Sequence, residues 1–373
     1  MDDYFDIVTL PQVASDQASD YDDGIFSESA SSYHTMSTLQ SREVAEYFRS
    51  ICGFTYPADE NVPLVFPADA TADRLDVLLH VMVRLCLGGE NVPHAINVML
   101  REGGVSRDGS GAKVLDVVTN SGTWVNEMAG TYSTAKFVTL DSKPLIPHKP
   151  HARIEFQVYD FYAGLMEADN TFDLVHIRQG VLATKDFNFL LRELHRVLKP
   201  NGYIMITELP FDTYEGTTHK VPIHSATNIA QGIIFAYEMC AAQGVDTDAW
   251  KDMAVRLAPG HPLWGNPGAR DPNPGPARRV SAVQNAHGFR DISLNFVPVP
   301  IGTWHFDESQ QILGGLMRLW GFHQSQSSLP VVIQRGIEES AARAFIENLL
   351  QEVMEVDRYR AYMEFQIWLA RKI

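Results

Sequence analysis

Short apolar runs alternate with segments of helical spacing through the middle of the chain, and this alternation restricts the fold more than any other feature. The runs occupy residues 113–118, 136–141, 154–160, 172–178 and 202–208. Between the last two, apolar residues recur at helical spacing until Pro200 and Gly202 interrupt the pattern. Strands alternating with helices predict a parallel sheet covered on both faces, whose ligands bind beyond the carboxyl ends of the strands.

The rest of the chain adds to this core on both sides. We expect an α/β fold with a Rossmann-like, seven-stranded, mainly parallel sheet, completed by strand-like runs at 292–299 and 361–370. N-terminal helices and loop insertions would form a lid. A helix at 73–87 has apolar residues on most faces, which predicts that it is largely buried. The predicted division is a flexible acidic tail at 1–40, a helical cap at 41–110, the core at 111–210, a substrate insertion at 211–290 and closing strands and helices at 291–373.

Charge and cysteine content exclude several classes of protein. The 373 residues carry 30 Lys and Arg against 46 Asp and Glu, a net charge of −16, and such a surface repels nucleic acid and anionic lipid. Cys52, Cys86 and Cys240 form no metal-binding spacing. No apolar run reaches the roughly 18 residues of a membrane span, and no secretory signal is visible. We expect a cytoplasmic or nuclear protein that binds a small molecule but no metal, nucleic acid or membrane; a protein partner or a homodimer stays open.

An aspartate accompanies each of the first three strand-like runs. Asp116 lies in the first, Asp141 ends the second, and Asp160 ends the third. A carboxylate at the end of the second strand can accept both hydroxyls of a ribose, as in dinucleotide-binding folds. An acid after the third strand can accept the adenine amino group. A single aspartate of this kind more often caps a helix, but three on successive strands indicate a nucleoside site.

Several segments together resemble the class I S-adenosylmethionine-dependent methyltransferases, and among them the fungal LaeA-like group. The segment DRLDVLLHVMVRLCLGG resembles that group's N-terminal helix, and KVLDVVTNSGTWVNEMAGTYSTAKFVTLDSKPLIP its cofactor loop and second strand. NTFDLVHIRQ and LLRELHRVLKPNGYIMITEL resemble the fourth and fifth strands and the helix between them. GFRDISLNFVPVPIGTW and AYMEFQIWLARKI resemble its closing β-hairpin, so the resemblance spans residues 73–373.

The resemblance implies S-adenosylmethionine as the cofactor and assigns roles to the acids. Asp116 would face its methionine end, Asp141 beside Ser142 would hold the ribose diol, and Asp160 would meet the adenine. The other residues implied at the cofactor are Val118, Asn120 and Gly122 in the loop, Tyr159 and Phe161 as walls, and Arg178 where the fourth strand opens onto the site. An ion pair of Arg178 within the fold is the alternative.

The cofactor loop departs from the family pattern at two positions. The family reads LDVGTGTG where this chain reads LDVVTNSG, so Val118 and Asn120 replace glycines. Asparagine tolerates a left-handed backbone, whereas a β-branched valine resists positive φ and adds two methyl groups near the ligand. We expect the loop to keep its function if Val118 has ordinary β dihedral angles, and to bind more weakly or not at all if it does not.

Two residues at strand ends, His176 and Glu208, are candidate general bases. Methyl transfer depends mostly on positioning, and a base is needed only where the acceptor must lose a proton. The alternative for His176 is a hydrogen-bonded, half-buried imidazole, and for Glu208 a local cap or pair. The acceptor pocket is expected in 212–243 and 259–276, with Tyr237, Trp264 and Trp304 either as its walls or as core residues.

Three functions agree with these features. The first is methylation of a small molecule, for which the resemblance implies a fungal secondary metabolite. The second is a methyltransferase-like regulatory or scaffolding protein with weak or absent catalysis, suggested by the altered loop and the acidic N-terminus. The third is an enzyme of this fold that catalyses another reaction. Binding of S-adenosylmethionine separates the first function from the second.

Overall fold

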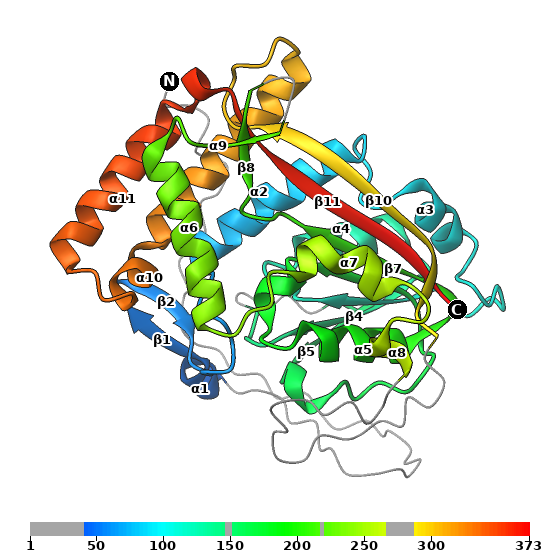
Figure 1. Cartoon of the computed structure of the whole chain (residues 1–373). Helices are drawn as coiled ribbons and strands as arrows, with labels where there is room; N and C mark the ends of the chain where they lie inside the picture. Colours follow the sequence, from blue (N-terminus) through cyan, green and yellow to red (C-terminus); the bar gives the residue numbers. More distant parts are fainter. Residues whose placement is uncertain (1–40, 146–150, 217–219, 266–286) are drawn as a thin grey trace, which may run out of the picture. The chain divides into compact units, whose positions relative to one another are not determined.

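The structure, a computed structural model, describes residues 41–145, 151–216, 220–265 and 287–373 (Figure 1). The chain divides into residues 1–40 and a body from Ser41 to Ile373. The predicted acidic tail therefore lies outside the described residues, and so does the part of the Pro- and Gly-rich stretch after Gly265.

Five parallel strands form the centre of the sheet, in the order β5-β4-β3-β6-β7. The chain builds outward from β3 through β4 to β5 and then crosses back to β6 on the other side of β3. This reversal makes a switch point between β3 and β6, where sheets of this kind bind ligands. The five strands are β3 (Lys113–Val117), β4 (Lys136–Asp141), β5 (Ile154–Val158), β6 (Phe172–Arg178) and β7 (Leu198–Glu208).

Two long antiparallel strands complete the sheet. β11 (Ala361–Lys372) lies between β7 and β10 (Phe289–Pro300), so seven long strands confirm the predicted Rossmann-like sheet. Two short strands that the sequence did not indicate, β8 (Thr213–Glu215) and β9 (Val221–Pro222), extend it beside β11. The expected closing hairpin is wrong in its connection, because three α-helices separate β10 from β11 in the chain.

Alternation along the strands divides the core between the two faces of the sheet. In β3, Val114 packs into one cluster of buried residues, and Leu115 and Val117 pack into another. Helices on both faces confirm the predicted α/β class. The first face is covered by α2 (Ala70–Cys86), α3 (His94–Arg101) and α4 (Thr123–Thr131), and the second by α5 (Phe187–Val197), α7 (Ala249–Leu257) and α8 (Pro262–Gly265).

Four further helices group at one side of the sheet (Figure 1). α9 (Glu308–Ser327) contacts α2 and α11 (Glu339–Met354), and α11 contacts α6 (Thr227–Ala242) and α10 (Leu329–Gln334). The cap that the sequence predicted as helical also contains an antiparallel hairpin, β1 (Phe48–Ile51) and β2 (Phe54–Pro57). The Tyr56 hydroxyl joins this hairpin to α9, because it donates to the carbonyl of Ser327 at 3.0 Å.

Helix α2 is less buried than its sequence indicated. It packs against α4 and α9, but Val77, Val81 and Leu85 are 41%, 37% and 46% exposed. These residues lie four apart and form one stripe, so the expectation of a largely buried helix is wrong for this face. Apolar residues on most faces of a helix do not show how many of those faces the fold will cover.

The docking of α9 depends on the absence of a side chain at Gly314. A Cβ there would lie 1.9 Å from the carbonyl oxygen of Gly302, whose N–H donates to the Gly314 carbonyl at 2.8 Å. We expect Gly314→Ala to lower the free energy of unfolding by about 1–3 kcal/mol through overpacking, measured by urea denaturation. Gly315→Ala is the matched control, because a Cβ there meets only Thr303 Cγ2 at 4.0 Å. It should gain up to about 1 kcal/mol from helix propensity, and equal losses in both variants would contradict this account.

Candidate functional site

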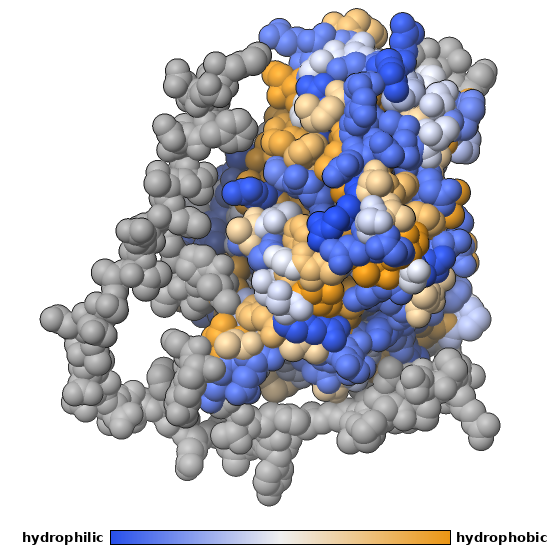
Figure 2. Space-filling model, turned by 90° about the vertical axis from the view of Figure 1, so that its left-hand side faces the viewer, coloured by the Kyte–Doolittle hydropathy of each residue, from blue (hydrophilic) through white to orange (hydrophobic). Residues whose placement is uncertain are grey.

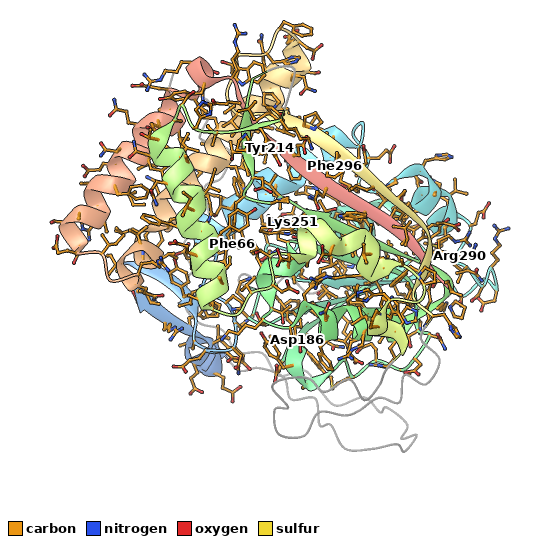
Figure 3. The ribbon with its side chains drawn as sticks, viewed as in Figure 1. Phe66, Asp186, Tyr214, Lys251, Arg290 and Phe296 are labelled. Carbon is orange, nitrogen blue, oxygen red and sulfur yellow. The ribbon has the colours of Figure 1, made fainter. Side chains whose placement is uncertain are left out.

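A cleft of about 760 Å³, counted to its open mouth, lies where β3, β4 and β6 end. One wall comes from the segment 57–67 and from α2, and it includes Phe66, which is labelled in Figure 3. Trp320 of α9 closes a further side. The cleft therefore occupies the switch point of the sheet. The strand ends contribute Val118, Asn120, Asp141, Ser142, Lys143 and Gln179 to its lining.

The loop after β3 has the backbone of a glycine-rich loop, although valine and asparagine replace two of its glycines. Val118, Asn120 and Gly122 have φ angles of 62°, 52° and 72°. The Val118 N–H donates to the Leu140 carbonyl at 2.9 Å, and the Asn120 side chain donates to the Val118 carbonyl at 3.0 Å. A left-handed residue other than glycine costs roughly 1–2 kcal/mol. The structure thus places Val118 in the unfavourable of the two expected conformations, on the wall of a cleft that stays open.

Asp141, at the end of β4, is the predicted acid that lines the cleft. It is 4% exposed, and its Oδ2 accepts the N–H of Asn120 at 2.9 Å and lies 3.5 Å from Lys143 Nζ. Its Oδ1 receives only longer bonds, from Lys143 N at 3.3 Å and Ser142 Oγ at 3.5 Å. The carboxylate therefore holds the loop with one oxygen and keeps capacity on the other for ligand hydroxyls.

The other two predicted acids are engaged elsewhere and do not line this cleft in the described structure. Asp160 is exposed and caps the short 3₁₀ turn that follows it, accepting the N–H of Tyr162 at 2.8 Å. Asp116 is buried within β3, opposite His176 in the neighbouring β6. Of the two predicted aromatic walls, Phe161 lines the cleft, whereas the hydroxyl of Tyr159 donates to the Gly164 carbonyl at 2.6 Å. The assignments of Asp116, Asp160 and Tyr159 to the cofactor stay predictions.

His176 is a buried, hydrogen-bonded imidazole. Its Nδ1 lies 2.7 Å from Asp116 Oδ1, and its ring stacks on Trp124 with the centroids 3.7 Å apart. Burial lowers the pKa of His176, although Asp116 opposes this shift, so the neutral ring donates its Nδ1 proton to the carboxylate. This geometry matches the alternative weighed for His176, and its role as a base stays a prediction.

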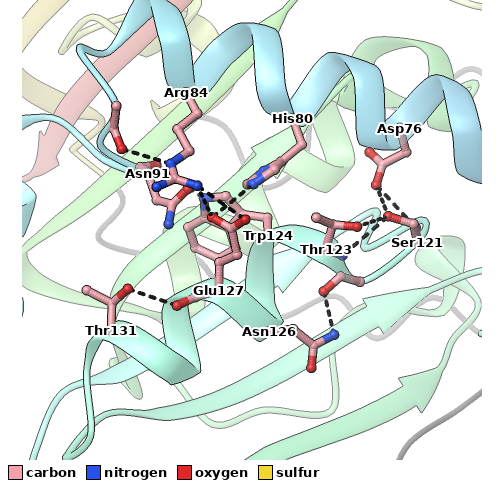
Figure 4. Close-up of polar contacts among 12 residues, drawn as sticks. Asp76, His80, Arg84, Asn91, Ser121, Thr123, Trp124, Asn126, Glu127 and Thr131 are labelled. Carbon is pink, nitrogen blue, oxygen red and sulfur yellow. Dashed lines mark hydrogen bonds and ion pairs between the residues drawn. The ribbon is translucent and has the colours of Figure 1, made fainter. Parts of the chain in front are cut away.

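Arg178 belongs to a buried network between α2 and the sheet. Its guanidinium contacts Asp76 Oδ1 at 2.5 Å and His80 Nδ1 at 3.4 Å, and both members of the ion pair are 4% exposed. Asp76 also accepts the side chain and the N–H of Ser121, in the loop before α4 (Figure 4). His80 Nε2 lies 3.2 Å from Glu127 of α4. Arg178 thus has the structural pairing that the sequence left open, and the network fixes α2 over the cleft.

Glu208 is fully buried behind the turn that follows β6. Its carboxylate accepts the N–H of Val181 at 3.2 Å and the indole N–H of Trp250 at 2.9 Å. Burial raises its pKa to about 7, although these hydrogen bonds oppose the shift. It does not contribute to the cleft's lining in the described structure, so its role as a base also stays a prediction.

The sequence reasoning did not assign Asp76 or Gln179 to the cleft that they line. Asp76 lies within an apolar helical run, and a lone acid in such a run signals a buried partner. Gln179 follows directly after β6; its Oε1 accepts the N–H of Leu209 at 2.9 Å, while its Nε2 is buried with no partner among the described residues. A hydrogen-bond acceptor bound in the cleft would provide the partner that this buried amide lacks.

The aromatic residues predicted as acceptor walls lie elsewhere. Trp264 packs against His195 and Phe289, and Tyr237 packs against Trp250. Trp304 donates its indole N–H to the Ala361 carbonyl at 3.0 Å. None of the three lines the cleft in the structure as described, which agrees with their alternative reading as structural residues.

Within the described ranges, no three His, Cys, Asp or Glu side chains are arranged to hold a metal ion. No helix among the same residues combines the length and apolar character that crossing a bilayer requires.

Removing Asp76 should strongly destabilise the body, because Arg178 would be left buried and unpaired. We expect Asp76→Ala to lower the free energy of unfolding by about 3–5 kcal/mol, measured by urea denaturation. The exposed pair of Glu339 and Arg343, 59% and 54% exposed, provides the control. Glu339→Ala should cost less than about 1 kcal/mol, and similar losses in the two variants would show that the buried pair has no special role.

Glu208 should make the protein less stable as the pH rises. Its pKa is raised from 4.5 to about 7 in the folded state, so the folded protein keeps a proton that the unfolded chain releases. The resulting stabilisation is complete below pH 4.5 and is lost as the pH rises through about 7, a change of about 3 kcal/mol. The difference in unfolding free energy between wild type and Glu208→Gln should therefore fall over this range. A difference that is constant with pH would refute the prediction.

The chain is similar in sequence to several known proteins. A family model described as a methyltransferase domain matches residues 114–202. The chain is 25% identical over 256 residues to methyltransferase pytC of Aspergillus terreus (strain NIH 2624 / FGSC A1156), covering 68% of this chain and 66% of that protein. It is 23% identical over 263 residues to the secondary metabolism regulator laeA of Aspergillus flavus, covering 69% and 59%.

The chain thus spans slightly less than two thirds of the length of these relatives. Among solved structures, phosphoethanolamine N-methyltransferase 2 of Haemonchus contortus is 15% identical, with a TM-score of 0.37 and coverage of 85% of this chain and 62% of that one. The family match shows a methyltransferase domain at residues 114–202, and the chain is similar to methyltransferases and secondary metabolism regulators of the LaeA-like group.

Proposed function

We propose that the protein is a methyltransferase that transfers the methyl group of S-adenosylmethionine to a small molecule of fungal secondary metabolism. The observation that carries the proposal is Asp141, a buried carboxylate at the tip of the second parallel strand that lines a cleft at the switch point. The match to a methyltransferase domain over residues 114–202 supports the same activity. Relatives from Aspergillus named for methyl transfer and for secondary metabolism support the substrate class.

The groups around the cleft fit the cofactor. Asp141 would accept the ribose hydroxyls, and the Phe161 ring would pack against the adenine. Asp76, which also lines the cleft, would attract the methionine ammonium group, and the unpaired Nε2 of Gln179 would donate to the carboxylate. The donors and acceptors thus complement the two ends of the molecule.

The chain's contribution to the reaction would be positioning. When bound, S-adenosylmethionine supplies an electrophilic methyl group on a sulfonium sulfur. The cleft residues would hold that group in line with an acceptor and exclude water, which supplies much of the rate enhancement in such displacements. Neither His176 nor Glu208 lines the cleft among the described residues, so neither is placed to take a proton from an acceptor there, and an acceptor hydroxyl or amine would release its proton to solvent or to another group.

A regulatory protein with weak or absent catalysis is the second candidate. The φ angle of 62° at Val118 favours it, because the strained loop presents two methyl groups where the family has none. The name of the Aspergillus flavus relative, a secondary metabolism regulator, favours it as well. The two candidates differ in whether the cleft binds S-adenosylmethionine and whether transfer follows.

Calorimetric titration with S-adenosylmethionine and S-adenosylhomocysteine tests the proposal. We expect binding by the wild type, and a loss of at least about tenfold in affinity in Asp141→Asn, since one charge and one acceptor are removed. Val118→Gly should tighten binding, because it removes the methyl groups from the cleft wall and the strain from the loop. Methyl transfer from labelled cofactor to a metabolite extract would then identify the acceptor.

Asp248→Asn is the matched control, because Asp248 is 74% exposed on the surface. Its affinity should equal that of the wild type. If the wild type and Val118→Gly both fail to bind either compound, the methyltransferase proposal is wrong. Binding without transfer to any metabolite would favour the regulatory candidate.

A further inference from the structure

A second cavity of about 1010 Å³, counted to its mouth, lies among the helices beside the sheet. Its walls come from α6, α9, α10 and α11. Further lining residues come from the segment between β2 and α2, from β8 and β11, and from residues next to β8 and β10. Figure 2 views the molecule from the side of these helices and shows apolar side chains gathered among polar ones on that face.

The lining of this cavity is mainly apolar and carries no charge among the described residues. It includes Phe235 and Met239 of α6, Met317 of α9 and Leu349 of α11. No charged side chain belongs to it in the described part of the chain, although the protein as a whole carries a net charge of −16. A ligand charge buried here would have no partner, and such burial is strongly unfavourable. The cavity therefore selects neutral, mainly apolar molecules.

The cavity and the cofactor cleft share part of their lining. Trp320 lines both spaces, and of two consecutive residues Val65 lines the cavity and Phe66 lines the cleft. One helical turn after Trp320, the Oε1 of Gln324 is buried with no hydrogen-bond partner among the described residues, and Gln324 also lines the cavity. The Oε1 of Gln324 can therefore accept a hydrogen bond from a donor group in the cavity.

From these contacts we propose that the cavity binds the methyl acceptor, and that the acceptor is a neutral, mainly apolar molecule with a hydroxyl or an aromatic amine near its reactive end. The proposal rests on the proposed methyltransferase function. The apolar body would lie among α6, α9 and α11, the donor group would bond to Gln324, and the reactive end would meet the cofactor cleft beside Trp320. The helices α9, α10 and α11 would then help to determine which substrate binds. The sequence analysis had placed this role in the insertion at 211–290 alone.

Filling the cavity from α9 tests the proposal without disturbing the cleft. A Cβ at Gly321 would meet only Val353 Cγ1, at 3.9 Å, and Gly321 lines the cavity, so Gly321→Leu places a side chain into it. Gly315→Leu is the matched control, since the same change on the same helix lies outside the cavity's lining. The probes are N-phenyl-1-naphthylamine, which is neutral and carries an N–H, and its anionic 8-sulfonate analogue, both followed by fluorescence.

We expect wild type to bind the neutral probe saturably and the sulfonate at least about tenfold more weakly. Gly321→Leu should weaken binding of the neutral probe by at least about tenfold, because the new side chain displaces several carbon contacts. Gly315→Leu should bind it like the wild type. Both variants should bind S-adenosylhomocysteine like the wild type, and saturating S-adenosylhomocysteine should not displace the probe.

The two readouts separate the two proposals. Absence of S-adenosylhomocysteine binding by the wild type would contradict the methyltransferase function. Unchanged probe binding in Gly321→Leu, equal binding of the sulfonate, or displacement of the probe by S-adenosylhomocysteine would overturn the assignment of the cavity. A loss of folding stability in Gly321→Leu could not by itself explain weaker binding of the neutral probe. Unchanged binding of S-adenosylhomocysteine would show that the variant is still folded.

Discussion

The buried ion pair between Asp76 and Arg178 is the interaction on which the site depends. A charge buried away from water strongly destabilises the fold unless an opposite charge lies beside it. Here Asp76 lies on α2 and Arg178 on β6. Asp76 also accepts the N–H of Ser121 in the loop before α4. One carboxylate therefore connects α2, β6 and the loop after β3. Without this carboxylate α2 would keep only the contacts of His80 and Arg84 among its polar contacts to β6 and α4 within the described residues, and the wall that α2 supplies to the cleft would be less firmly held.

The sequence predicted the sheet well because strand and helix signals are local. Alternating apolar runs located β3 to β7, and α5 occupies 187–197 as its apolar spacing indicated. The functional site was harder to predict from the sequence, because the aspartates of successive strands have different surroundings in the fold. Asp141 lines the cleft, Asp160 caps a turn, and Asp116 is opposite His176. Register and capping are set by neighbours in space, which the order of residues does not show.

The position of the acceptor cavity could not be found from the insertion alone. Aromatic residues in 211–290 suggested walls there, yet Trp264 and Tyr237 pack into the core around α5 and α7. Residues of α9 and α11 line the cavity together with residues of α6, and this space arises from how the three helices pack. Whether such stripes close on each other or leave a space depends on small residues such as Gly232 and Gly321, which also line the cavity.

Trp320 is part of both walls, and this sharing has a thermodynamic consequence. If one occupant shifts the indole, the dissociation constant of the other changes by some factor, and linkage requires that the second occupant return the same factor to the first. A single side chain would then couple the two binding equilibria, with no movement of the sheet. Substitutions at that position would alter this cooperativity even where each separate affinity is preserved.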